Sequence, residues 1–309
     1  MERLTAIAFP GQGAHSVEMG RDIYEAYPEA REIFDLTDKR LGRPLTALMF
    51  EGPFETLSET VNTQLAVYCL NHICFELAAS RGIKGDFFLG HSLGEYNALT
   101  SAGVVDFETG LKLVEKRAAL MQEAATKHPG AMFAVLGLPD DEVERQVDKA
   151  VKEGGVAVVA NYNCPGQTVV SGDIGTMTDV RKACEQAGAR KVIELKVSGG
   201  FHSSLMSEAA DSLSVIIDSV MFNKPKVPVA SNFTGRLSTD PGVLKDALKR
   251  QMTGSVHWTV SVREVIEAGA DRFVETGPGT VLSGLIRRIA GDAVETINVN
   301  SAESMEGLS

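Results

Sequence analysis

Short apolar runs alternate with longer amphipathic stretches along most of the chain. The runs at residues 5–10, 85–90, 227–231 and 271–277 have the length of buried strands. Between them, apolar residues recur at spacings of three and four, which is typical of helices packed on one face. The alternation predicts an α/β fold, with a largely parallel sheet flanked by helices.

The clearest amphipathic helix follows Asp106, a residue suited to cap a helix N-terminus. Its apolar stripe consists of Phe107, Leu111, Val114, Ala118 and Met121. Arg117 lies beside this stripe, so that it faces either the core or the surface next to it.

The pattern changes between residues 130 and 197. Two helical stretches, 139–154 and 173–188, separate four strand-like runs in the order β-α-β-β-α-β, which is typical of a ferredoxin-like domain. We therefore predict a small ferredoxin-like domain over 130–197, inserted into a large domain formed by 1–129 and 198–309. A ligand cleft is expected between them.

Composition and charge limit the classes of function. The formal net charge of −11 gives no overall positive field, so we expect no nucleic-acid partner. The first apolar run breaks at Pro10, too early for a signal peptide, and no later run has membrane-spanning length. We expect a cytoplasmic protein without a membrane partner, and a frayed tail over 301–309.

The four cysteines show no CxxC pair and no spacing with histidine that suits zinc. They are Cys69, Cys74, Cys164 and Cys184. We interpret them as buried thiols of a reducing compartment, and we predict neither a disulfide framework nor a metal site.

Candidate chemistry begins at Gly90–Gly94, with the sequence GHSLG between a predicted strand and a predicted helix. This is the context of a nucleophile elbow, a strained turn that lifts Ser92 clear of the sheet. Glycine is favoured at both ends because larger side chains would collide with neighbouring elements. The amide of Leu93 then points at an oxyanion. The alternative is a serine N-cap in a glycine-rich turn.

Ser92 needs a base to become a nucleophile. Of the six histidines, His91 is adjacent, and neighbouring side chains at such a turn diverge. His202 follows a Gly-Gly pair and opens a predicted helix, but spacing alone does not select it. A second glycine corner, Gly11–Gly13, allows the Gln12 amide to serve as a second oxyanion donor. It lacks the third glycine of a dinucleotide site, and the chain has no Walker A motif.

These motifs and others in the same order resemble the malonyl-CoA:acyl carrier protein transacylase family. The matching segments are FPGQG at 9–13, NTQLA at 62–66, GHSLGEY at 90–96, KRAALMQ at 116–122, NYNCPGQTVVSG at 161–172, GGFHSSLM at 199–206, QMTGSVHW at 251–258 and ETGPGTVLSGL at 275–285. The resemblance implies an α/β hydrolase-like large domain with a ferredoxin-like insert, as the pattern predicts.

The resemblance also implies roles for matching residues. Ser92 would be the acylated nucleophile and His202 its general base, with the backbone amides of Gln12 and Leu93 as the oxyanion hole. The main-chain carbonyl of Gln251 would orient the histidine in place of a carboxylate.

Four further positions concern the substrate. Arg117 would bind the free malonyl carboxylate with its planar guanidinium; the alternative is a solvated helix arginine. Phe201 matches the malonyl-using pattern, since relatives that take methylmalonyl usually have a smaller residue there. Gln64 and Asn163 either line the site or are ordinary polar groups that satisfy backbone atoms.

The implied reaction is ping-pong transfer of malonyl from coenzyme A to Ser92, and then to the phosphopantetheine thiol of an acyl carrier protein. No permanently bound cofactor is expected. Asn97 and the Val-Ser-Gly before Gly200 resemble discrete acyltransferases of polyketide synthesis, whereas alanine or proline is more usual at the position of Gly200. Fatty-acid and polyketide synthesis both remain open.

Two other functions compete with this interpretation. One is a proofreading acyl hydrolase of a polyketide assembly line, against which Arg117 argues. The other is a carrier-protein docking module without activity, against which the complete motifs argue. Because carrier proteins are usually acidic, we also predict a basic docking patch among Arg181, Lys182, Arg190, Lys191, Arg287 and Arg288.

Overall fold

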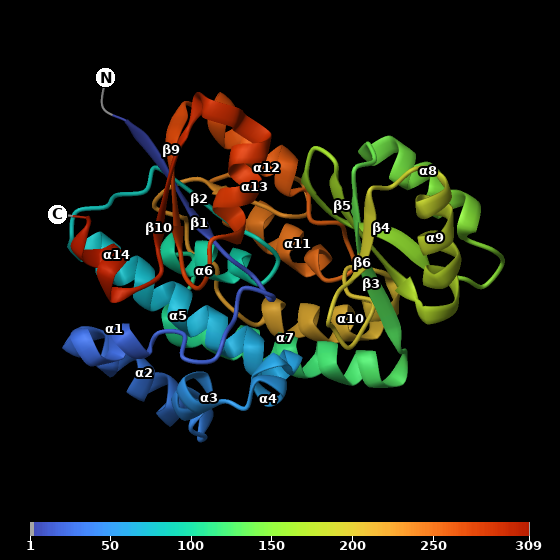
Figure 1. Cartoon of the computed structure of the whole chain (residues 1–309). Helices are drawn as coiled ribbons and strands as arrows, with labels where there is room; N and C mark the ends of the chain where they lie inside the picture. Colours follow the sequence, from blue (N-terminus) through green and yellow to red (C-terminus); the bar gives the residue numbers. More distant parts are fainter. Residues whose placement is uncertain (1–2, 309) are drawn as a thin grey trace.

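The computed structural model describes residues 3–308 and contains two sheets (Figure 1). The larger sheet has the strand order β10-β9-β1-β2-β7-β8. All neighbours pair in parallel except β7 and β8. The bounds are β1 Leu4–Phe9, β2 Phe87–Gly90, β7 Val229–Ala230, β8 Leu237–Ser238, β9 Ala270–Thr276 and β10 Glu295–Val299. The parallel sheet predicted from the apolar runs is confirmed.

Helices cover both faces of this sheet, because its strands bear apolar side chains on both faces, as β1 illustrates. Its successive side chains alternate between two hydrophobic cores: Ile7 and Phe9 join one, and Ala6 and Ala8 join the other. The first core is closed by α1 Arg21–Ala26, α2 Pro28–Leu41, α3 Leu45–Glu51, α4 Phe54–Ser58, α5 Thr60–Ser80, α6 Gly94–Ser101, α7 Phe107–Lys127 and α10 Ser207–Asp218. The second is closed by α12 Trp258–Glu267 and α13 Val281–Ala290. The short η2 Gly291–Ala293 links α13 to β10.

Helix α7 forms as the sequence predicts. The side chain of Asp106 caps it by accepting a hydrogen bond from the Thr109 amide at 2.7 Å. The stripe packs inward, and Arg117 is buried with it.

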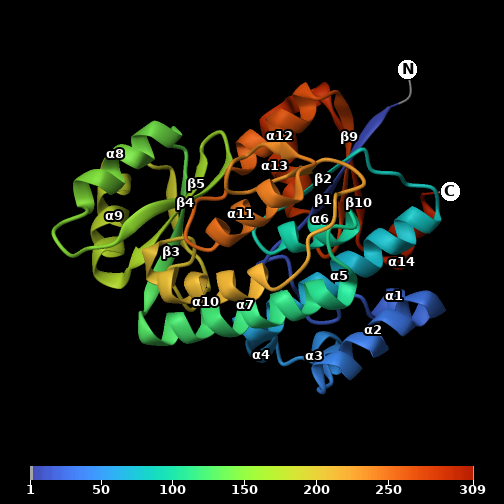
Figure 2. The same cartoon turned by 180° about the vertical axis from the view of Figure 1, so that it is seen from behind.

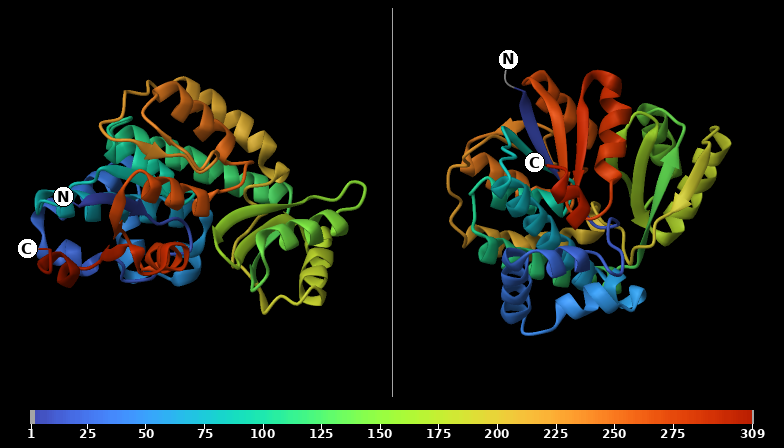
Figure 3. Two further views of the ribbon diagram at one scale, coloured as in Figure 1. Left: turned by 90° about the horizontal axis from the view of Figure 1, so that it is seen from above. Right: turned by 60° about the vertical axis from the view of Figure 1, so that its left-hand side comes forward.

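The smaller sheet has the order β4-β5-β3-β6, and every pair in it is antiparallel. Its elements are β3 Gly130–Leu136, α8 Asp140–Ala150, β4 Ala157–Cys164, β5 Gln167–Asp173, α9 Ile174–Gln186 and β6 Lys191–Glu194. This is the predicted ferredoxin-like arrangement, which we call the small domain; the rest is the large domain. Boundaries at 130 and 197 stay a prediction. The small domain projects from the side away from both termini (Figures 1 and 3).

The expectation of a frayed tail is wrong for the described residues. Helix α14 Ala302–Glu306 begins with a capping box between Ser301 and Ser304, and Met305 is fully buried in the first core. The cap satisfies backbone amides and the methionine supplies apolar burial, so the segment is anchored. Ser309 lies outside the described residues.

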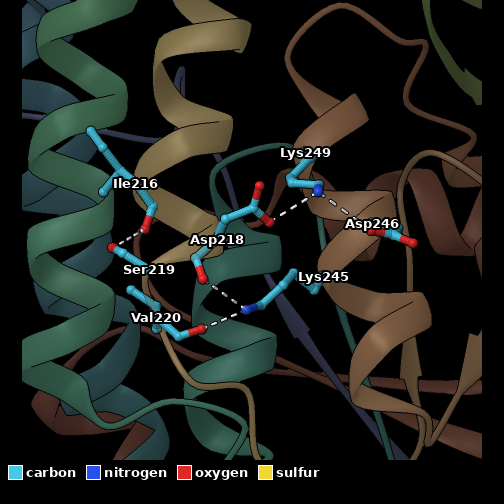
Figure 4. Close-up of polar contacts among 7 residues, drawn as sticks. All are labelled: Ile216, Asp218, Ser219, Val220, Lys245, Asp246 and Lys249. Atoms are coloured by element: carbon cyan, nitrogen blue, oxygen red, sulfur yellow. Dashed lines mark hydrogen bonds and ion pairs between the residues drawn. The ribbon is translucent and has the colours of Figure 1, made fainter.

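Two lysines fasten α11 Pro241–Gln251 to the end of α10 (Figure 4). Lys245 Nζ donates to the Val220 carbonyl at 2.6 Å, and Lys249 pairs with Asp218 at 3.0 Å. Cations at a helix C-terminus are favourable because the last carbonyls lack intrahelical partners. Seen from behind, α10 lies between α7 and α11 (Figure 2). The segment before α10 and the end of α11 both reach the candidate site.

Within residues 3–308, no helix combines the length and apolar character needed to cross a bilayer.

Candidate active site

The turn between β2 and α6 has the geometry of a nucleophile elbow. Ser92 has a φ of 51°, in the left-handed region that non-glycine residues rarely occupy. A Cβ at Gly90 would lie 2.0 Å from the Gly94 carbonyl carbon, and one at Gly94 would lie 2.0 Å from the Phe9 carbonyl oxygen. Both glycines are therefore required by close backbone approach, as the motif predicts.

His202 lies against this serine. Its Nε2 is 2.8 Å from Ser92 Oγ, and its Nδ1 is 2.9 Å from the Gln251 carbonyl and 3.1 Å from the Gly254 carbonyl. Because carbonyls only accept, Nδ1 carries the proton and Nε2 is free to accept from the serine hydroxyl. His202 also has a left-handed backbone, with a φ of 57°. The short η1 Ser204–Met206 follows it before α10.

Burial, followed by the nearby charge of Arg117, lowers the pKa of His202 to about 3. The imidazole is therefore neutral near pH 7, the form that can accept a proton. The family resemblance implied the Gln251 carbonyl as the group that orients His202. The Gly254 carbonyl was missed, because a backbone contact of this kind is not marked by any side chain.

Arg117 is almost completely buried beside the same serine. Its Nη1 donates to Gln64 Oε1 at 2.5 Å, and its Nη2 donates to Ser92 Oγ at 3.0 Å and Gln251 Oε1 at 3.2 Å. Its guanidinium also stacks over the Tyr96 ring. Burial lowers the pKa of Arg117. Among the described residues its partners are neutral amide and hydroxyl groups and it forms no ion pair, so its charge is available to an anionic ligand.

The Gln251 amide holds three parts of the site together. Its Nε2 donates to Glu95 Oε2 at 2.7 Å and to the Ser92 carbonyl at 2.8 Å, while its Oε1 faces Arg117. Burial raises the pKa of Glu95 to about 7, although hydrogen bonds and the charge of Arg117 oppose the rise. No role for Glu95 was predicted, because its partner Gln251 lies 156 positions away in the chain.

Asn232 is a second residue that sequence reasoning missed. Its Oδ1 accepts from the Ser92 amide at 2.6 Å, and its Nδ2 donates to the Gly90 carbonyl at 2.6 Å. Both bonds hold the elbow from the segment that follows the neighbouring strand β7. A polar residue directly after the apolar run 227–231 was the available signal, since the carboxyl ends of parallel strands share one edge of the sheet.

A cavity of about 240 Å³ opens over Ser92 between the two domains. Its lining includes Gln12, Arg117, Asn163, Phe201 and His202. The predicted interdomain cleft therefore exists. Asn163 Oδ1 is 2.8 Å from His91 Nε2. The imidazole of His91 is therefore paired with Asn163 and not with the adjacent Ser92. Gln64 lies behind Arg117 rather than in the lining.

The two glycine corners meet at this cavity. A Cβ at Gly11 would lie 2.4 Å from the His91 carbonyl oxygen and 3.7 Å from the Leu93 amide nitrogen. Glycine is needed there because the first corner packs directly on the elbow. No cluster of three or more potential metal-ligating side chains occurs in the part of the chain described.

The sequence of the chain is similar to a known protein family and to proteins of established name. The family model described as acyl transferase domain matches residues 7–304. The malonyl CoA-acyl carrier protein transacylase of Bacillus subtilis (strain 168) is 38% identical over 301 residues, covering 97% of this chain and 95% of that protein. The protein of the same name from Escherichia coli (strain K12) is also 38% identical over 301 residues, covering 97% of both chains.

Solved structures agree with this similarity. A malonyl-transacylase in complex with its type II polyketide synthase acyl-carrier protein superposes with a TM-score of 0.95 at 35% identity, covering 99% of this chain and 98% of that chain.

Proposed function

The chain belongs to the acyl transferase domain family, and we propose that it is a malonyl-CoA:acyl carrier protein transacylase of fatty-acid or polyketide synthesis. The observation that carries the proposal is the placement of Arg117. A buried guanidinium without an ion-pair partner among the described residues lies 3.0 Å from Ser92 Oγ. An acyl group with a free carboxylate is therefore held beside the nucleophile that receives it.

Acylation begins when Ser92 Oγ attacks the thioester carbonyl of malonyl-CoA. His202 Nε2 accepts the hydroxyl proton, while the carbonyls on its Nδ1 side fix the tautomer. The C–S bond then breaks, and the imidazolium returns the proton to the departing thiolate. The products are malonyl-Ser92 and coenzyme A.

The tetrahedral oxyanion is stabilised by the backbone amides of Gln12 and Leu93, which belong to the two glycine corners. The contact between Gly11 and the elbow supports this pairing, because it holds the corners at a fixed distance. Preorganised amides require no rearrangement as charge develops.

The second half-reaction repeats these steps with the phosphopantetheine thiol of an acyl carrier protein as the acceptor. His202 takes the thiol proton, and the thiolate attacks the ester carbonyl of malonyl-Ser92. The C–O bond to Ser92 then breaks, the imidazolium returns the proton to Ser92 Oγ, and malonyl leaves on the carrier protein. Malonyl-CoA and the carrier protein are the partners, and the chemistry uses no permanently bound cofactor. Phe201 and Asn163 line the cavity, so both contact the acyl group or its linker in this proposal.

The carrier protein is proposed to dock through basic residues near the cavity mouth. Arg288 donates to Gln167 Oε1 at 2.6 Å and joins α13 to the small domain, whereas Arg181 pairs with Glu185. Lys182, Arg190 and Lys191 form no ion pair within the described residues, so their charges are the more available to an acidic partner.

The location proposed is the cytoplasm. All four cysteines are free and buried, as expected for a reducing compartment.

The decisive experiment is intact-mass analysis of the protein mixed with malonyl-CoA, followed by addition of a holo acyl carrier protein. We expect a malonyl adduct on the enzyme that moves to the carrier protein. A matched sample with apo carrier protein, which lacks the thiol, should retain the adduct on the enzyme. Loss of the adduct to water at the same rate with either carrier form would favour the hydrolase and contradict the proposal.

A further inference from the structure

Glu95 is a buried carboxyl that the mechanism above does not use. It lies in the first turn of α6, three residues after Ser92, and is 1% exposed. It does not line the cavity, so it reaches the substrate only through other groups. A buried carboxylate is costly unless neighbouring groups stabilise it, so its surroundings indicate its role.

The side-chain amide of Gln251 lies between Glu95 and Arg117 in one defined orientation. Gln251 Nε2 faces the Glu95 carboxylate and its Oε1 faces the guanidinium. A reversed amide would place its oxygen against a carboxylate and its NH₂ against a cation, both unfavourable. Glu95 therefore balances the charge of Arg117 across one amide, without occupying the guanidinium itself.

The charge balance changes when an acyl group with a carboxylate enters. In the empty site at a pH above about 7, where Glu95 is ionised, Arg117 and Glu95 carry opposite charges. A malonyl carboxylate on Arg117 adds a second negative charge in a water-poor environment, where charges interact strongly. A second carboxylate near Glu95 raises the pKa of one of the two groups, so the site favours uptake of one proton. An acetyl group adds no charge and creates no such demand.

Other titratable groups face this cluster from each packed element. Burial raises the pKa of Tyr96 on α6 to about 12, and burial with the charge of Arg117 lowers that of His202 to about 3. Burial also lowers the pKa of His91. Only Glu95, with its pKa raised to about 7 by burial, titrates near neutrality among these groups. From the segment after β7, the Ser231 hydroxyl faces Glu95 and hydrogen-bonds to its ionised form, an effect that lowers the Glu95 pKa but is smaller than the effect of burial.

We propose that Glu95 is a specificity-determining residue that takes up one proton from solvent when the carboxylate of an acyl group pairs with Arg117. It thereby makes the preference for malonyl over uncharged acyl groups dependent on pH. This inference rests on the proposed function. Glu95 acts through Gln251 and Arg117 and is a positioning residue, since it does not touch the reacting atoms.

The proton can be counted because acylation itself is proton-neutral. The Ser92 hydroxyl proton leaves on the coenzyme A thiol, so an additional proton taken from solvent belongs to another group. The experiment follows a pH indicator in weak buffer while enzyme at high concentration reacts with malonyl-CoA. Intact mass gives the amount of acyl-enzyme in the same sample, and acetyl-CoA is the matched substrate without a carboxylate.

At about pH 8 we expect close to one proton taken up per malonyl adduct and none per acetyl adduct. At about pH 6 uptake by the malonyl reaction should be small, because Glu95 is already protonated in the free enzyme. For the same reason kcat/KM for malonyl-CoA should fall as pH rises above about 7, approaching roughly tenfold per unit, while that for acetyl-CoA should not.

E95Q keeps the size of the side chain and removes its titration. It should abolish proton uptake and flatten this fall in malonyl kcat/KM, so that the variant equals or exceeds the wild type at high pH. Glu76 on α5 is the control: partial burial also raises its pKa, its side chain is half exposed, and it lies outside the cluster. E76Q should retain the wild-type uptake and pH profile. A fold defect would affect both acyl-CoAs alike and would not remove a pH dependence specific to malonyl.

The outcomes separate the two proposals. Absence of any malonyl adduct overturns the proposed function and this inference together. A malonyl adduct that forms without proton uptake, or with the same uptake in E95Q, overturns only the role of Glu95. If E95Q does not fold, E95D decides, because it keeps a titratable carboxyl one methylene shorter. A shifted midpoint of uptake supports the role, and an unshifted midpoint overturns it.

Discussion

The large and small domains bury different kinds of side chain. Every acidic, arginine or histidine side chain that is buried in residues 3–308 belongs to the large domain: Glu95, Arg117, His202 and Glu275. The core of the small domain is apolar, and its charges lie in exposed pairs such as Arg145 with Glu142 and Lys152 with Asp179. Exposed pairs of this kind contribute little to stability, whereas buried charges need a built network.

The backbone shows the same difference. Ser92 and His202 have left-handed conformations, and no non-glycine residue of the small domain does. Strain of this kind persists where the surroundings over-determine the conformation, as they do at functional sites. The large domain therefore holds the reacting groups, while the small domain supplies a wall of the cavity with Met132, Ala134 and Val169. Changes to the reacting groups of the large domain should therefore affect both half-reactions, whereas charge changes on the surface of the small domain should affect only transfer to the carrier protein.

The largest effect should come from Ser92→Ala, which removes the atom that carries the acyl group. We expect no malonyl adduct by intact mass and an unchanged thermal unfolding curve, because the hydroxyl contributes little packing. Ser204→Ala, at an exposed serine near His202, is the control and should acylate normally. A normal adduct on the Ser92 variant would exclude this serine as the nucleophile.

His202→Ala should slow acylation by roughly 10²–10⁴-fold, with a residual rate supplied by the oxyanion hole. Rapid-quench measurement of the acyl-enzyme tests this, with exposed His128→Ala as the control. Wild-type acylation kinetics would mean that another group is the base.

Arg117→Ala tests whether the buried charge selects the substrate. The variant leaves the malonyl carboxylate without its partner, at a cost of about 2–5 kcal/mol, so malonyl kcat/KM should fall by orders of magnitude. Acetyl-CoA has no carboxylate, so the malonyl-to-acetyl ratio of kcat/KM should drop. Lys116→Ala, at the exposed neighbouring position on α7, should leave the ratio unchanged. Equal losses for both substrates would assign Arg117 to the fold or to the shared chemical step.

The smallest effect is expected in the small domain. Charge reversal at Arg190 or Lys191 should reduce transfer to the carrier protein only a few-fold and weaken its dependence on salt. Acylation by malonyl-CoA should not change, because neither residue lines the cavity. Asp271→Lys, at an exposed residue at the start of β9, provides a charge change on the other domain. Unchanged transfer and salt dependence would exclude each residue tested from the docking patch.

The sequence predicted the parts of this architecture that local physics determines. The elbow follows from two glycines around a serine at a strand-to-helix turn, and α7 follows from a cap and an apolar stripe. Contacts between distant segments were not predictable from spacing, which is why His202 was selected by resemblance and not by periodicity. Glu95 and Asn232 were missed because their partners are fixed only when the strands assemble. The prediction of a frayed tail was wrong because it was based on polar composition, which does not indicate a capping box or a single buried methionine.

The burial of the four cysteines has a chemical consequence. The proposed reaction brings two thiols and two thioesters to one cavity in turn, and an accessible thiolate on the enzyme would exchange acyl groups with them. Burial raises the pKa of Cys69 to about 12 and that of Cys184 to about 11, and it also raises the pKa of Cys74 and Cys164. The cysteine thiols of the protein therefore do not take part in the exchange. Between coenzyme A and the carrier protein, the acyl group is bound only to the oxygen of Ser92.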